Sequence, residues 1–280
     1  MNDSSHIFTV KNISELYTLM QNVTDITPLA GTTGLLKNCR TDRFSLPESI
    51  LLLKNLPELE TIIKRERFID FGAAATLNTI LELGAKNVPE ILYRALSLAA
   101  NPGVRSLATI GGNIAQAQIR NSAVIPLIAL DSKIEIRTKK ETFWMPLVRY
   151  CDENSSALRH TSHVILRIRV PFEEWSISQY KRLGPIGYIT SDTASFVFLA
   201  RIQKNVLSEV KLLFGGIGVI KSKEFENLLT GKSLPIDRRS IESLMKETER
   251  IFTDSFSSVG NFQKNCFFNL IEESLYLLTK

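Results

Sequence analysis

Cysteine is scarce in this sequence, and its few residues form no disulfide or metal-binding pattern. The 280 residues include Cys39, Cys151 and Cys266 as the three cysteines. An odd number at wide spacing excludes a disulfide framework. There is no Cys-x-x-Cys pair, so the chain lacks the usual ligand set of an iron–sulfur cluster. We therefore expect buried or chemically idle thiols.

Long hydrophobic runs are also missing, and charge of one sign is not concentrated anywhere. No apolar run is long enough to span a bilayer. The opening residues, MNDSSHIFTV, lack the basic and apolar regions of a signal peptide. The formal charge is +5 with scattered lysine and arginine, whereas a nucleic-acid-binding surface needs them clustered on one face. We expect a soluble, cytoplasmic protein that binds neither nucleic acid nor a membrane.

Histidine is rare, and common catalytic motifs are absent. His160 and His163 have a spacing that would suit a shared metal on a helix, but their surroundings predict a loop followed by a strand. Gly231-Lys232-Ser233 lacks the earlier glycine of a P-loop. There is no Ser/His/Asp signature. We expect no metal site, no nucleoside triphosphate site and no catalytic side chain in this chain.

The length and the 44% hydrophobic content suit two domains with sizeable cores. The first section begins with a predicted helix, because Ile13, Leu16, Met20 and Val23 recur at helical spacing and Asn12 or Ser14 is available as its N-cap. Predicted strands follow at Ile26–Ala30 and Ser49–Leu53. This order predicts a βαβ-like start of about 50 residues.

The middle section, about residues 58–172, mixes strands and helices. Strands are predicted at 68–72, 134–136 and 163–170, and helices at 76–83, 89–100 and 123–130. The loop Asn101-Pro102-Gly103 is expected to end the helix at 89–100. In the strand at 163–170, alternation places Val164, Leu166, Ile168 and Val170 on one face and Ile165, Arg167 and Arg169 on the other.

The last section, from residue 173, predicts a small α+β domain. Two strands, 193–202 and 207–219, are joined by Gln203-Lys204-Asn205 in a hairpin-like connection. From Ile236 the pattern becomes helical. One apolar stripe is Ile241, Leu244 and Met245, and a second, in a C-terminal helix, is Phe267, Leu270, Ile271, Leu275 and Leu278.

Two glycine segments carry the chemistry. They are Ala30-Gly31-Thr32-Thr33-Gly34-Leu35-Leu36 and Thr109-Ile110-Gly111-Gly112-Asn113. Glycine lets other groups approach the backbone closely, and concave runs of N–H groups bind anions. Each segment alone has the ordinary alternative of a tight turn. Together they predict two loops that bind the pyrophosphate of one dinucleotide.

These residues resemble a known family. Val104–Ala115, which contains Thr109-Ile110-Gly111-Gly112-Asn113, resembles the FAD-binding subunit of molybdenum hydroxylases, the group of xanthine dehydrogenase and carbon monoxide dehydrogenase. Pro28–Leu36 resembles the first FAD loop of that family. Gln179–Arg182 and Ser208–Ile217 resemble segments of its C-terminal domain. The resemblance runs through nearly the whole chain in the expected order.

The resemblance implies an α+β fold, with a two-subdomain FAD-binding domain of the PCMH type at residues 1–172 (subdomains about 1–57 and 58–172) and a small α+β C-terminal domain at 173–280. It implies FAD in the cleft between the subdomains. The implied FAD-binding residues are Pro28, Leu29, Ala30, Gly31, Thr32, Thr33, Gly34, Leu35, Thr109, Ile110, Gly111, Gly112, Asn113, Ser122, Ile165 and Lys181.

The same resemblance implies a role in a heteromeric oxidoreductase. A molybdopterin subunit would hydroxylate the substrate, an iron–sulfur subunit would relay electrons, and this chain would pass them through FAD to NAD or another acceptor. Two departures from the family pattern leave alternatives open. The first loop commonly reads Ala-Gly-Gly-Thr-Asp rather than Ala30–Gly34, and Ser122 stands where an aspartate is common. The alternatives are a non-catalytic scaffold subunit that has lost FAD and a stand-alone flavin reductase or oxidase.

Overall fold

The computed structural model describes residues 5–37, 46–54, 56–152, 161–256 and 260–279, and the chain divides into two compact units. The N-terminal unit comprises Met1–Pro89, Ala100–Gln118 and Leu130–Phe172. The C-terminal unit comprises Glu90–Ala99, Ile119–Ala129 and Glu173–Lys280. Two stretches of the expected first domain thus pack with the C-terminal unit. The domain boundaries themselves stay a prediction.

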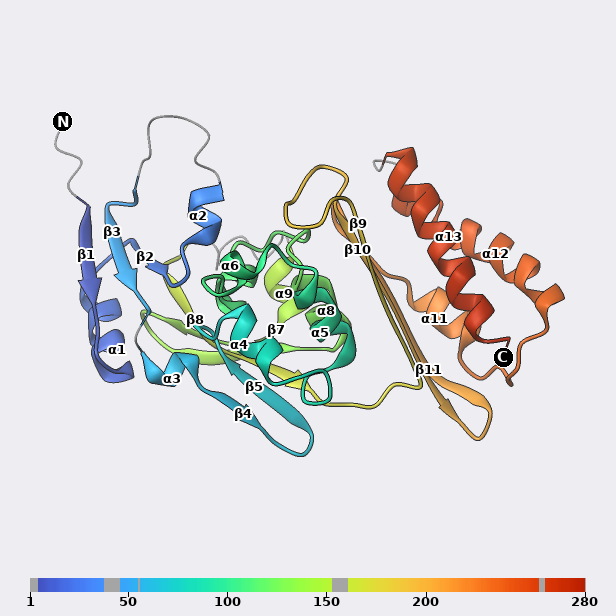
Figure 1. Ribbon diagram of the computed structural model, residues 1–280, viewed down its shortest axis with the longest axis horizontal. Helices are drawn as coiled ribbons and strands as arrows, with labels where there is room; N and C mark the ends of the chain where they lie inside the picture. Colours follow the sequence, from blue (N-terminus) through green and yellow to red (C-terminus); the bar gives the residue numbers. More distant parts are fainter. Residues whose placement is uncertain (1–4, 38–45, 55, 153–160, 257–259, 280) are drawn as a thin grey trace. The chain divides into compact units, whose positions relative to one another are not determined.

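A parallel three-stranded sheet opens the N-terminal unit (Figure 1). Its strands lie in the order β1 (His6–Thr9), β3 (Ser49–Leu52) and β2 (Ile26–Leu29). Helix α1 (Ile13–Asn22) connects β1 to β2, and its Asn12 side chain accepts a hydrogen bond from the Glu15 N–H, so Asn12 is the N-cap. The predicted helix and both predicted strands are confirmed.

A five-stranded antiparallel sheet forms the rest of this unit. Its order is β4 (Ile62–Lys64), β5 (Phe68–Gly72), β8 (His163–Pro171), β6 (Lys133–Thr138) and β7 (Thr142–Pro146). The short helices of the N-terminal unit lie between the strands of its two sheets: α2 (Thr33–Lys37), α3 (Pro57–Glu60), α4 (Leu77–Glu82), α6 (Pro102–Arg105), α7 (Ile110–Ala115) and α9 (Leu147–Cys151).

Strand β8 departs from simple alternation. Its pairing with β6 shifts between Arg167 and Ile165, which oppose Glu135 and Ile136. A bulge adds one residue to the strand and re-aims the side chains before it. Ile165, predicted to share a face with two arginines, is 6% exposed as a result. Val164 and Leu166 pack in the core that contains Leu16 of α1.

The region after residue 100 also differs from its prediction. The sequence predicts a loop at Asn101–Gly103, but Pro102 begins α6, and the Asn101 side chain caps it by accepting from the Val104 N–H. Proline suits the first helical position, where its missing N–H costs nothing. The preceding helix, α5 (Glu90–Ser97), is shorter than the range 89–100.

The C-terminal unit is built on an antiparallel sheet in the order β12 (Val219–Ile220), β11 (Val206–Gly215), β10 (Ala194–Gln203) and β9 (Ile177–Leu183). The hairpin between β10 and β11 is confirmed, and its turn residues Lys204 and Asn205 have φ of 50° and 60°. Two positive φ angles in succession are typical of a type I′ turn, whose twist matches the strands.

Helices cover both faces of this sheet. Helix α5 packs on β9, and α8 (Val124–Ala129) packs on β10 and β11. Helices α11 (Lys223–Leu229) and α13 (Asn261–Leu277) pack on β11 and β10, respectively. Helix α12 (Arg238–Phe252) packs on α13, and a 3₁₀ turn, η2 (Asp254–Phe256), follows α12. None of the helices in the described ranges combines the length and hydropathy needed to cross a bilayer.

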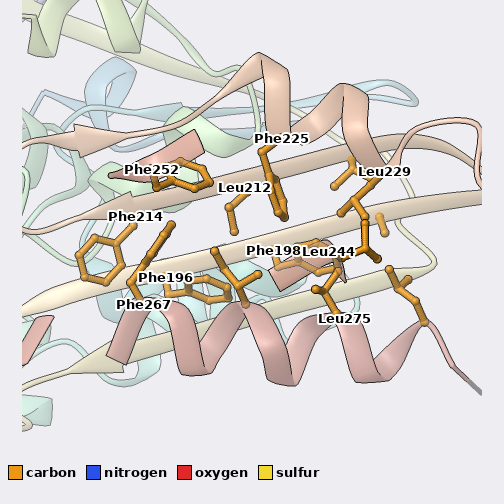
Figure 2. Packing of buried hydrophobic residues seen from close by; sticks show 14 of the residues in the cluster. Phe196, Phe198, Leu212, Phe214, Phe225, Leu229, Leu244, Phe252, Phe267 and Leu275 are labelled. Carbon is orange, nitrogen blue, oxygen red and sulfur yellow. The ribbon is translucent and has the colours of Figure 1, made fainter. Parts of the chain in front are cut away.

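Phenylalanine dominates the core between β10, β11 and the C-terminal helices (Figure 2). The Phe267 ring lies 4.8 Å from Phe256, 5.0 Å from Phe252 and 5.4 Å from Phe214, centroid to centroid. These are the distances of favourable aromatic pairs. The stripes predicted in the two long helices therefore form this core.

Candidate functional site

The first glycine segment turns the chain sharply from β2 into α2. Thr32 has φ of 55°, a left-handed conformation that costs a β-branched residue about 1–2 kcal/mol. The Thr33 N–H donates to the Gly31 carbonyl at 2.8 Å, and the Leu35 N–H donates to the Thr32 carbonyl at 3.0 Å. The family glycine missing at Thr32 thus coincides with the residue that adopts a positive φ.

The turn needs glycine at position 31, because another backbone segment lies directly against this residue. A Cβ on Gly31 would lie 1.9 Å from the Leu107 carbonyl oxygen, far inside van der Waals contact. Leu107 lies two residues before the second glycine segment. The two segments, distant in sequence, are therefore close together at the backbone, and only glycine permits it.

The second glycine segment forms the first turns of helix α7 rather than the predicted loop. Thr109 is its N-cap, and the Thr109 Oγ1 accepts from the Gly112 N–H at 3.1 Å. Gly111 packs against the end of strand β5, because a Cβ there would lie 2.6 Å from the Ala73 carbonyl oxygen. The pattern Thr-Ile-Gly-Gly-Asn thus encodes a capped helix start that approaches a strand closely.

The backbone N–H groups of the two glycine segments differ in whether they have acceptors within the chain. In α7 the N–H groups of Ile110, Gly111 and Asn113 donate to the carbonyls of Ala75, Ala73 and Thr109, respectively. These three N–H groups of the second predicted pyrophosphate-binding loop therefore already donate within the chain. In the first segment the N–H groups of Gly31, Thr32 and Gly34 meet no acceptor among the described residues. Free N–H groups beside a left-handed residue form an anion-binding concavity.

A cavity of about 440 Å³ lies within the N-terminal unit between these segments and β8. This size is typical of a ligand-binding pocket. Of the predicted residues, Pro28, Ala30, Gly111, Gly112 and Ile165 line it. The other predicted residues of the N-terminal unit do not line the cavity: Leu29, which ends β2, and the segment residues Gly31, Thr32, Thr33, Gly34, Leu35, Thr109, Ile110 and Asn113.

Other lining residues were not predicted. They are Asp25, Ile26, Thr27, Leu53, Ala73, Ala115, Thr161, Ser162 and His163. Most lie in strands or directly beside them, so their positions depend on strand pairing. The sequence analysis considered His163 only as a metal ligand together with His160 and expected no metal site there; His160 lies outside the described residues.

The His163 ring contacts a buried tyrosine and a backbone carbonyl. Its Nε2 lies 3.0 Å from the hydroxyl of Tyr150, and its Nδ1 lies 2.9 Å from the Thr161 carbonyl oxygen. The fully buried Tyr150 donates to the Ala115 carbonyl at 3.0 Å. Among the described residues, no group of three or more histidine, cysteine or acidic side chains could hold a metal ion.

Ser122 and Lys181 belong to the C-terminal unit. The buried Ser122 hydroxyl accepts from Arg182 at 3.4 Å, and the half-exposed Lys181 pairs with Glu273 at 2.9 Å. Both side chains therefore have partners of their own. Of the cysteines, Cys151 is buried and Cys266 half-buried, no disulfide joins them, and Cys39 lies outside the described residues.

Comparison with known proteins identifies the family. Residues 3–173 match the model described as the FAD binding domain in molybdopterin dehydrogenase. The chain is 31% identical over 153 residues to the nicotinate dehydrogenase FAD-subunit of Eubacterium barkeri, covering 52% of this chain and 50% of that one. It is 28% identical over 204 residues to the 6-hydroxypseudooxynicotine dehydrogenase complex subunit alpha of Paenarthrobacter nicotinovorans, covering 69% and 66%.

The chain spans about half of the nicotinate dehydrogenase subunit and 14% of a matching maize indole-3-acetaldehyde oxidase. Among solved structures, it superimposes on quinoline 2-oxidoreductase from Pseudomonas putida 86 with a TM-score of 0.80 at 16% identity, covering 99% and 97% of the two chains. For carbon monoxide dehydrogenase from Hydrogenophaga pseudoflava the TM-score is 0.77 at 19% identity, covering 97% and 94%. These likenesses confirm the predicted fold. The chain belongs to the family of FAD-binding domains of molybdopterin dehydrogenases.

Proposed function

We propose that this chain is the FAD-binding electron-transfer subunit of a molybdenum-containing hydroxylase or dehydrogenase, an oxidoreductase. One observation carries the proposal. Two glycine segments distant in the sequence come together where Gly31 meets Leu107, and they flank a cavity of about 440 Å³ in a chain of the FAD-binding family. Two glycine segments that pack closely at a cavity wall are typical of a dinucleotide-binding site, and an ordinary tight turn would not require this packing.

The residues present fit FAD in two ways. The N–H groups of Gly31, Thr32 and Gly34, which meet no acceptor within the described ranges, suit a pyrophosphate. Pro28, Ile165 and Leu53 give the cavity an apolar wall, which suits an aromatic ring system. The other predicted contacts, including Ser122 and Lys181, are part of the proposal.

Bound FAD supplies the redox chemistry, and the chain's residues position and shield it. No side-chain base is needed for electron transfer, in keeping with a cavity lined mainly by small and apolar residues. We place the molybdopterin and the iron–sulfur clusters on partner subunits. Two relatives named as a FAD-subunit and as a subunit of a complex support this division. NAD or another acceptor would receive the electrons.

The test is a visible absorption spectrum of the purified chain, before and after incubation with FAD. We expect a protein-bound flavin band that a reductant bleaches. Gly31→Ala should abolish or strongly weaken this band, because its Cβ would overlap the Leu107 carbonyl oxygen. Gly103→Ala is the matched control, since a Cβ there meets only the Asn101 Oδ1 at 3.4 Å.

Each alternative gives a distinct result. A well-folded chain that retains no flavin, alone or with partner subunits, would support the scaffold alternative and overturn the proposal. Turnover of NADH with a dye by the isolated chain would favour a stand-alone reductase. A flavin band that is equally strong in Gly31→Ala would place the cofactor away from the two glycine segments.

A further inference from the structure

One acidic residue lines the cavity. Among the described residues around it, Asp25 alone has an acidic side chain, and no lysine or arginine is present. Asp25 is exposed to solvent and directly precedes β2. Within the described ranges, its carboxylate has no hydrogen bond or ion pair of its own. A donor group on a ligand can therefore bind to it.

Strand β2 separates this carboxylate from the first glycine segment. Because a strand rises about 3.3 Å per residue, the four residues Ile26–Leu29 place the two features roughly 13 Å apart along the chain. A left-handed residue stands on each side of β2, since φ is 55° at both Asp25 and Thr32. Such backbone conformations are costly and cluster at binding sites. The strand thus has N–H donors after one end and a carboxylate before the other.

The two ends of β2 attract different parts of a dinucleotide. The pyrophosphate is anionic, so the N–H groups of the glycine segment attract it and the carboxylate of Asp25 repels it. Asp25 instead suits neutral hydroxyl groups, because a carboxylate accepts charge-assisted hydrogen bonds with both of its oxygens. The adjacent 2′- and 3′-hydroxyls of a ribose match this pair of acceptors.

The redox chemistry indicates which half of FAD lies beside Asp25. Electrons taken up by the flavin ring add negative charge to it, and a carboxylate in contact with the ring would oppose that uptake. The adenosine half keeps its charge throughout, and its ribose carries two neighbouring hydroxyls. The carboxylate of Asp25 is therefore favourable beside the adenosine half and unfavourable beside the flavin.

We propose that Asp25 recognises the adenosine half of FAD by accepting hydrogen bonds from the 2′- and 3′-hydroxyls of its ribose. The role of Asp25 rests on the proposed function, because it needs FAD in this cavity. Asp25 then determines specificity: the cavity selects FAD over FMN, which lacks adenosine, and over nucleotides that lack a ribose hydroxyl. No covalent bond changes, and no electrons move.

The experiment compares the native 280-residue chain with Asp25→Asn, using flavin fluorescence to measure the affinity for FAD and FMN. Asparagine has the size of aspartate and tolerates a left-handed backbone, but it has one acceptor oxygen and no charge. We expect Asp25→Asn to bind FAD about tenfold more weakly, the loss typical of a hydrogen bond to a charged group. FMN should bind weakly and equally to both proteins.

ADP and two of its analogues identify the group that Asp25 binds, by competition with FAD. 2′-Deoxy-ADP lacks one ribose hydroxyl, and inosine diphosphate lacks the amino group of adenine. The native chain should bind 2′-deoxy-ADP several-fold more weakly than ADP, whereas Asp25→Asn should bind the two almost alike. The ratio of the affinities for ADP and inosine diphosphate should be the same in both proteins.

Asp131→Asn is the matched control. Asp131 is exposed, has φ of 52° and belongs to the same unit, but it does not line the cavity. This variant should bind every ligand as the native chain does, because it keeps the carboxylate of Asp25.

The outcomes separate the role of Asp25 from the proposed function. Equal FAD affinities in Asp25→Asn and the native chain would overturn that role and leave the FAD site intact. Equal affinities of the native chain for ADP and 2′-deoxy-ADP would do the same, as would a loss in Asp25→Asn that is as large for FMN as for FAD. Inability of ADP to displace FAD would also overturn it. Failure of the native chain to bind FAD would overturn both.

Discussion

At the scale of single residues, the burial of Tyr180 in β9 makes the stability of the chain depend on pH. Its side chain is 4% exposed, and its hydroxyl lies 3.2 Å from the Ser195 Oγ. Burial raises the pKa of Tyr180 above its ordinary value, and it outweighs the opposing effects of Ser195 and Arg182. The unfolded chain therefore releases this proton at a lower pH than the folded chain.

The sign of the effect follows from linkage. Below pH 10.0, the ordinary pKa of tyrosine, the folded and the unfolded chain both keep the Tyr180 proton. The contribution of Tyr180 to the free energy of unfolding is then complete. As the pH rises above this value toward the folded pKa, the free energy of unfolding falls by at most about 1.4 kcal/mol per pH unit. Tyr180→Phe should reduce this alkaline slope in urea unfolding measured across the range. It should also cost about 1 kcal/mol at neutral pH, because Ser195 loses a hydrogen-bond partner.

Tyr276→Phe, at an exposed position of α13, is the control for tyrosine ionisation in general. It should leave the slope as in the native chain. An alkaline slope that is the same in Tyr180→Phe and the native chain would contradict the assignment to Tyr180.

Other residues of the site show the limit of sequence reasoning at this scale. The sequence alone does not predict a positive φ at Thr32, since β-branched residues rarely adopt one. The resemblance identified both glycine segments but not His163, which lines the cavity and contacts Tyr150. His163 starts β8 and Tyr150 belongs to α9, and a contact between two such elements leaves no pattern in the local sequence. Such contacts become visible only in the folded structure.

At the scale of secondary structure elements, helix α7 depends on its cap. It has six residues, two of them glycines, which are poor helix formers. Thr109→Ala removes the acceptor for the Gly112 N–H and should cost about 1 kcal/mol of unfolding free energy. It should also weaken FAD binding, because Gly111 and Gly112 line the cavity. Denaturant unfolding and a FAD titration measure the two effects.

Two further variants define this test. Thr109→Ser keeps the hydroxyl and should behave almost as the native chain does. Ser222→Ala removes the cap of α11 in the C-terminal unit and should lower stability without changing the FAD affinity. Equal FAD affinities in Thr109→Ala and the native chain would show that the helix start does not shape the site.

Long periodic elements were predictable, and short ones were not. The stripes of α12 and α13 and the hairpin of β10 and β11 follow directly from hydrophobic spacing. Strand β1 has four residues and no fully buried side chain, so it has no pattern to detect. Helix α6 has four residues, and its Pro102 and Gly103 favour a loop. The Asn101 cap and a proline at the first position were the available signal for a helix.

At the scale of the whole molecule, each unit has a hydrophobic core of its own. The core of the N-terminal unit joins α1, β2 and β3 to the first half of β8. That of the C-terminal unit centres on Phe267, which contacts several other phenylalanine rings (Figure 2). Separate cores predict that damage to one unit can be confined to it, since cooperative unfolding follows contiguous packing.

Phe267→Ala tests this expectation. Removing a fully buried phenylalanine should cost about 3–5 kcal/mol. Native-state hydrogen exchange should show loss of protection in β9–β11 and α11–α13, while β5, β6 and β8 keep theirs. Phe267→Leu, which preserves more volume, should give the same pattern at a smaller cost. If protection fell equally in both units, the chain would unfold as one cooperative body, and the stability of the FAD cavity would depend on the phenylalanine core.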